Sequence, residues 1–127
     1  MEKHMRKLAA ATLFAFSATI PAPALAGFET GNDVLSACRS LRTENFFDAG
    51  RCLGYVVAIS DMLEINWFLY NRVDCQMPER VTKGQVADIV VAYLERNPGT
   101  RHQSAAGLVS MAIQEQFCAN NRKASGG

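Results

Sequence analysis

The chain has 127 residues, of which 49% are hydrophobic and 20% charged, and its formal net charge at neutral pH is +1. This length suits one small domain with a single core. Because the charges nearly cancel and no basic run stands out, the composition argues against a nucleic-acid partner. The sequence contains no nucleophile elbow, HExxH, P-loop or GxGxxG motif, so we expect no catalytic residue and no cofactor.

The first 26 residues have the three parts of a secretory signal. Three basic residues precede position 8, an apolar run occupies 8–20, and small residues surround Ala26. The run is shorter than the roughly 20 residues that span a bilayer. We therefore expect export and cleavage after Ala26, a folded domain over 27–118, and a polar, disordered tail over 119–127.

Four cysteines follow this signal, at Cys38, Cys52, Cys75 and Cys118. An even number of cysteines in an exported chain predicts two disulfides. A zinc site is the competing interpretation. It is the weaker one, because no cysteine pair has CxxC spacing and His102 is the only histidine after the signal. We accordingly expect no bound metal.

Apolar residues recur at helical spacing in two segments of the first half of the domain. The first runs from about 32 to 41, with Thr30 or Asn32 as its cap. The second runs from about 51 to 70 and is apolar nearly all round, which predicts a helix buried on several sides or one that also serves a dimer interface. It carries Asp61, Glu64 and Asn66, so we expect no membrane insertion. The loop expected before it contains the turn-forming residues Asn45, Asp48 and Gly50.

Individual residues of the second segment have structural interpretations. Gly54 and Ala58 at helical spacing indicate a close helix–helix contact, and Tyr55 belongs to an apolar face. Asp61 has three interpretations: a functional carboxylate in a cleft, a partner of a buried arginine, or part of a solvated stripe. The core or a dimer interface is expected to hold Trp67, Phe68 and Tyr70.

Two further helices are expected in the second half of the domain. Thr82 and Gln85 fit a capping box, and the apolar pattern after them ends at Asn97. The fourth helix is expected to open near Thr100, with Gln103 offering a second capping box. The predicted fold class is therefore all-α, a small disulfide-stapled domain resembling a four-helix bundle.

Helix geometry restricts how the cysteines pair, because bridged Cα atoms must lie within about 7 Å. A helix from Cys52 to Tyr70 is about 27 Å long. The five residues to Cys75 reach back at most about 18 Å, so Cys52–Cys75 does not close. Four helices running up and down bring Cys38 to Cys52 at one pole and Cys75 to Cys118 at the other.

The segment 71–80 is polar, contains a proline and is expected to be held by Cys75. A loop held by a disulfide loses little entropy on binding, which favours a recognition element; an ordinary helix connection is the alternative. The candidate partner-binding residues are Arg72, Asp74, Gln76, Glu79 and Arg80.

Four groups of residues stand out as motifs along the domain: Gly31-Asn32-Asp33-Val34-Leu35 with Cys38, Cys52-Leu53-Gly54-Tyr55-Val56 with Asp61, Cys75 with Pro78, Val81, Thr82, Gly84 and Gln85, and Pro98, His102, Ser104-Ala105-Ala106 and Phe117-Cys118. In order and spacing these groups resemble the Rap/Tai immunity proteins of bacterial type VI secretion. This resemblance implies a small periplasmic helical protein that binds and inhibits a peptidoglycan amidase effector, in a family whose members often form homodimers.

Two other functions compete with this one. A small periplasmic stress chaperone would expose the apolar second helix when a dimer dissociates. An enzyme would use Asp61 or His102 as its acid–base group, but His102 has the simpler interpretation of a surface histidine. We expect a binding protein rather than an enzyme.

Overall fold

The computed structural model describes residues 27–119; the expected signal over 1–26 and most of the expected tail lie outside the described residues. Within the described part the chain is helical and has no strand, which confirms the all-α class. The α-helices are α1 (Gly31–Arg39), α2 (Phe46–Leu69), α3 (Lys83–Arg96) and α4 (Ala105–Phe117), with short 3-10 turns at Ser40–Arg42 and Pro98–Thr100.

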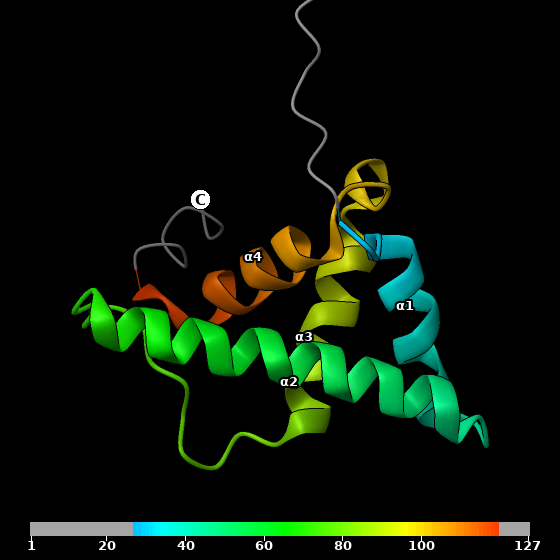
Figure 1. Ribbon diagram of the computed structural model, residues 1–127, viewed down its shortest axis with the longest axis horizontal. Coiled ribbons are helices and arrows are strands. Elements are labelled where there is room, and N and C mark those ends of the chain that lie inside the picture. The colour runs from blue at the N-terminus through cyan, green and yellow to red at the C-terminus, as the bar shows by residue number, and fades with distance from the viewer. Residues whose placement is uncertain (1–26, 120–127) are drawn as a thin grey trace, which may run out of the picture.

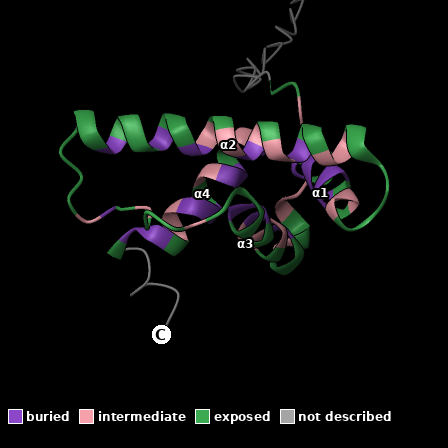
Figure 2. Ribbon diagram, turned by 90° about the horizontal axis from the view of Figure 1, so that it is seen from below, coloured by how far each residue is buried: buried purple, intermediate pink, exposed green. Residues whose placement is uncertain are grey.

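The helices form two layers. The long α2 makes one layer by itself, and α1, α3 and α4 all pack against the same side of it (Figure 1, Figure 2). In Figure 1 α3 runs across α2 rather than alongside it, and in Figure 2 it is seen nearly end-on below α2. The domain is therefore a stapled group of four helices, but its axes do not all run up and down.

Only one stripe of α2 is buried, which corrects the expectation of a helix enclosed on several sides. The opposite face is open to solvent along the whole helix (Figure 2). Because a domain this small has too few residues to cover both faces of α2, that face stays uncovered within one chain. The buried stripe consists of Cys52, Val56, Ser60, Leu63 and Trp67.

The core lies where the two layers meet. Each of the four helices contributes apolar side chains, and the deepest of them are almost completely removed from water. Burial of such side chains is worth about 1.5–3 kcal/mol each, the dominant favourable term in folding. The largest fully buried side chains are Leu94, Leu108, Ile113, Val56, Val90, Val109, Cys52 and Cys118.

The two disulfides lie near opposite ends of α2. Cys38, near the end of α1, bonds to Cys52 in the first part of α2, with 4.8 Å between the Cα atoms. Cys75, in the loop after α2, bonds to Cys118 at the end of α4, with 4.0 Å between the Cα atoms. These are the pairs expected from the sequence, for which helix length excluded Cys52–Cys75 and an up-and-down course of the helices selected the pairing.

Two helix starts differ from the predicted ones. The second helix begins at Phe46, so Asp48 and Gly50 belong to it, and Asn45 is its cap because the Asn45 side chain accepts a hydrogen bond from the Asp48 amide. Sequence spacing placed this start about five residues too late. The exposed Phe46 and Phe47 lie outside the apolar pattern that marked the helix.

The fourth helix does not open at Thr100, and no capping box forms there. Thr100 ends a 3-10 turn and its hydroxyl donates to the Asn97 carbonyl. The helix instead begins at Ala105, whose amide donates to the Glu29 carbonyl at 2.9 Å. The incoming segment before α1 thus satisfies a free amide that a side-chain cap would otherwise serve.

Capping boxes start α1 and α3, and they differ in charge. Thr82 and Gln85 cap α3 reciprocally, with an uncharged amide as the acceptor. Thr30, and not Asn32, caps α1 together with Asp33. The Thr30 hydroxyl, and then its amide, donate to the Asp33 carboxylate and hold the pKa of that carboxyl below its usual range.

This difference predicts a pH effect confined to α1. A carboxyl whose folded pKa is lowered stabilises the fold above its unfolded pKa of about 3.9 and loses that contribution as the pH falls through the folded value. Asp33→Asn should therefore lower the free energy of unfolding at pH 7, and this effect should fade as the pH falls below about 3.9. Urea titrations at several pH values measure this. Gln85→Ala is the control, and an equal pH dependence in both variants would contradict the assignment.

The α2 helix is long and apolar enough to cross a membrane by length and composition alone. The core helix of a soluble protein passes the same test. In this structure α2 packs against α1, α3 and α4, and Cys52 ties it to α1. One face of α2 thus contributes apolar side chains to the core, and the other face is exposed in the single chain.

Candidate partner-binding surface

The loop between α2 and α3 leaves the end of α2, swings out to one side and returns to the start of α3 (Figure 1). Its turn begins at Asn71, which has a φ of 50°. Asparagine tolerates this left-handed conformation better than most residues. The Arg72 amide then donates to the Trp67 carbonyl at 2.8 Å and closes the helix. The loop therefore starts in a defined direction.

The middle of this loop is attached to the end of α4. The Cys75–Cys118 bond lies between two backbone hydrogen bonds. The Gln76 amide donates to the Phe117 carbonyl at 3.1 Å, and the Ala119 amide donates to the Asp74 carbonyl at 2.7 Å. One covalent and two hydrogen bonds thus hold a segment that has no secondary structure of its own, and order it before any partner binds.

Arg72 and Asp74 contact each other. The Arg72 Nε and Nη2 atoms donate to the two Asp74 carboxylate oxygens at 2.9 and 3.0 Å. The hydrogen bonds to Asp74, followed by the charge of its carboxylate, raise the pKa of the Arg72 guanidinium above its usual value. Arg72 Nη2 also lies 3.5 Å from Cys75 Sγ. Ion pairs this exposed add little stability, so we read the pair as one that orients the loop.

The other three candidate residues follow the disulfide. Gln76, Glu79 and Arg80 are all exposed. Gln76 lines a hollow of about 450 Å³ together with Arg72 and the side of Trp67. Glu79 lines a different hollow, on the α3 side of the loop. The structure therefore gathers Arg72, Asp74 and Gln76 around the disulfide and places Glu79 and Arg80 on a separate turn before α3.

A family model for Rap1a immunity proteins matches residues 30–118. The chain belongs to the Rap1a immunity protein family. The matched region runs from the cap of α1 to the last disulfide cysteine, so it includes all four helices. No curated protein and no solved structure matches the chain. Membership indicates a toxin-immunity role carried out by binding a protein effector, a kind of activity that is typically not enzymatic.

In this Rap1a-family domain the residues singled out on α2 have open surroundings. A Cβ atom added at Gly54 would meet nothing within 4 Å, and Ala58 is exposed. Within one chain they make no close helix contact, contrary to expectation. Asp61 is exposed, so it is not the partner of a buried arginine. His102 is exposed as well, as a surface histidine would be.

The aromatic residues of α2 divide between the core and the surface. Trp67 is buried, whereas Phe68 and Tyr70 are 84% and 72% exposed. Tyr55 is half-buried, and burial, followed by the charge of Glu29, raises the pKa of its phenol. Phe68 also lines the hollow beside Arg72, so exposed aromatic surface continues from α2 into the disulfide-held loop.

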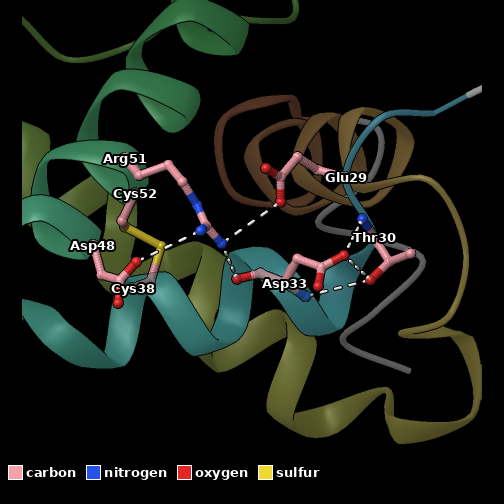
Figure 3. Close-up of polar contacts among 7 residues, drawn as sticks. All are labelled: Glu29, Thr30, Asp33, Cys38, Asp48, Arg51 and Cys52. Atoms are coloured by element: carbon pink, nitrogen blue, oxygen red, sulfur yellow. Dashed lines mark hydrogen bonds and ion pairs between the residues drawn. A yellow bond between two sulfur atoms is a disulfide. The ribbon is translucent and has the colours of Figure 1, made fainter.

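A charged cluster around Arg51 lies beside the Cys38–Cys52 disulfide (Figure 3). The Arg51 guanidinium lies 3.7 Å from the Glu29 carboxylate and 3.5 Å from that of Asp48, and it donates to the Asp33 carbonyl at 3.3 Å. It thereby fastens the segment before α1 to both α1 and α2. The i,i+3 spacing of Asp48 and Arg51 was the one signal for this cluster, because its other contacts are distant in sequence.

Proposed function

We propose that this Rap1a-family protein is a periplasmic immunity protein that binds and inhibits a peptidoglycan amidase effector of type VI secretion. The observation that carries the proposal is the exposed, disulfide-held loop on a chain of an immunity family. Two disulfides suit an oxidising compartment, which favours the periplasm over the cytosol. Exposed polar residues beside an aromatic surface are the composition of a binding site for a protein.

Exported co-expression tests the proposal. Cells that export a candidate amidase effector should lyse, and cells that also export this protein should survive. The matched control lacks residues 1–26 and keeps the domain in the cytosol, where it should not protect. Failure of the exported protein to protect against any amidase effector, or equal protection by the control, would contradict the proposed target or the proposed location.

We also propose that the outer face of α2, defined as Gly54, Ala58, Met62, Ile65 and Leu69, pairs with a second copy of this chain. These residues recur at helical spacing and all are exposed. Gly54 and Ala58 are small enough for two helix backbones to approach closely, while the three larger side chains supply apolar area. An apolar face this continuous on a monomer favours an interface.

Gly54→Leu tests this pairing, because the added side chain meets open space in one chain but would separate two close helices. The variant should fold at least as well, since glycine inside a helix costs about 1 kcal/mol relative to a good helix former. Light scattering after gel filtration should give the wild type a dimer mass and the variant a monomer mass. A monomeric wild type, or a dimeric variant, would contradict the proposed interface.

The same outer face is the observation that favours a stress chaperone as the second candidate function. Its exposed side chains Met62, Ile65 and Leu69 would bind unfolded clients. Light scattering of a client protein denaturing at low pH separates the two candidates. An immunity protein should leave aggregation unchanged, whereas a chaperone should suppress it at a few-fold molar excess.

A further inference from the structure

A groove of about 340 Å³ lies between α2, the last part of the disulfide-held loop and the start of α3. Its volume is at the low end of the roughly 300–1,000 Å³ found for ligand pockets. Apolar surface from each of the three elements lines it, contributed by Val57, Met77, Pro78, Val81 and Val86. An occupant would therefore need an apolar portion.

Three carboxylates, those of Asp61, Glu64 and Glu79, also line this groove. All three are exposed, and Lys83 is the one cationic residue among the lining residues. Asp61 and Glu64 come from α2, whereas Glu79 comes from the loop, so the fold itself brings them to one place. The groove thus combines an apolar lining with an excess of negative charge.

These carboxylates stand out from the other acidic side chains of the described chain. Glu29, Asp48, Asp74, Asp88, Glu95 and Glu115 each have an arginine partner, and Asp33 is bonded to Thr30. Among the described acidic residues, only Glu44 and the three in the groove have neither an ion pair nor a side-chain hydrogen bond. Three of the four unpaired carboxylates in the described part of the chain therefore line this groove.

We propose that this groove receives a lysine or arginine side chain of the protein effector, an inference that rests on the proposed immunity function. The aliphatic stem of such a side chain would lie on the apolar lining, and its cationic head would sit among the three carboxylates. Like charges gathered in one groove repel each other, and an incoming cation relieves that repulsion. The Lys83 side chain lines the same groove, so its positive charge repels an incoming lysine or arginine.

The affinity of the complex between this protein and its amidase effector tests the groove. Removing the three charges with Asp61→Asn, Glu64→Gln and Glu79→Gln should weaken binding about 30-fold or more. The matched control changes net charge equally but outside the groove, with Glu44→Gln, Asp88→Asn and Glu95→Gln, and should stay within about threefold. Lys83→Gln should strengthen binding. Equal effects of the two triple variants would overturn the proposal.

A peptide probe tests the groove separately from the proposed function. In NMR titrations, acetyl-Ala-Lys-Val-Ala-amide should shift the backbone signals of Asp61, Glu64 and Glu79 at millimolar concentration. The same peptide with norleucine in place of lysine should shift them far less. Shifts spread equally over Glu44 and Asp88, or unchanged with norleucine, would overturn the cation site. A wild type that binds the lysine peptide but no amidase would overturn only the proposed function.

Discussion

Removing the Cys75–Cys118 disulfide should cost the domain about 4 kcal/mol of unfolding free energy on the chain-entropy model. The bond closes a loop with a sequence separation of 43 residues and holds the segment that we propose binds the effector. Small domains are stable by only about 5–15 kcal/mol, so Cys75→Ala with Cys118→Ala should lower the melting temperature by roughly 20 °C. Thermal melts followed by circular dichroism measure this.

The other disulfide supplies the control for a role in binding. Cys38→Ala with Cys52→Ala opens a shorter loop, with a separation of 14 residues, and should cost about 3 kcal/mol. Both variants lose stability, but only loss of Cys75–Cys118 should also weaken binding to the effector at a temperature where both remain folded. Equal affinities for the two variants would show that the loop needs no disulfide to bind.

Replacing Gly31 with valine should destabilise the domain by about 3 kcal/mol, the upper end of the usual cost of overpacking. A Cβ atom at Gly31 would lie 2.6 Å from Leu108 Cδ1, 3.0 Å from the Arg101 carbonyl oxygen and 3.1 Å from Leu94 Cδ2. Leu94 and Leu108 are fully buried, and the Arg101 carbonyl accepts a hydrogen bond from the Asn32 amide. None of these neighbours can move cheaply.

Gly107→Val is the matched control for this substitution. Gly107 is also a glycine in the first turn of a helix, but it faces open space and lies outside the proposed dimer face. Chemical denaturation of the two variants should give a large loss for Gly31→Val and a change within about 0.5 kcal/mol for Gly107→Val. Comparable losses for both would contradict crowding against Leu94, Arg101 and Leu108 as the cause, because valine has a higher helix propensity than glycine.

Helix existence, the α3 boundaries and the cysteine pairing could be predicted from the sequence. Local sequence signals determine the existence of the helices and the boundaries of α3. These signals are the Thr82–Gln85 capping box and the helical spacing of apolar residues. Helix length excluded Cys52–Cys75, and the expected up-and-down course of the helices selected the observed pairing. The pairing agrees with the structure although α3 runs across α2, because no cysteine lies on α3.

The face that α2 buries could not be predicted. An apolar residue such as Ile65 or Leu69 carries the same sequence signal whether it faces a core or a partner. The predicted start of α4 was wrong for a related reason. The acceptor for the Ala105 amide is the Glu29 carbonyl, which is distant in sequence, whereas Thr100 and Gln103 matched a local pattern.

The candidate site was predicted in part. The loop was identified by its polar residues and by its position next to Cys75 in the sequence. The structure places it on the surface beside Phe68. The spacing of Arg72 and Asp74 did not reveal that they pair with each other. The groove was not predicted because its charged residues come from α2 and from Glu79, and only the path of the loop brings them together.

Inhibition of a purified peptidoglycan amidase effector by the purified, oxidised domain is the most direct measurement of the central claim. Release of muropeptides should stop at about one copy of the immunity domain per effector, because the protein acts by occluding the enzyme and not by turnover. The account would be contradicted if a large excess of the folded protein left hydrolysis unchanged for every amidase effector tested.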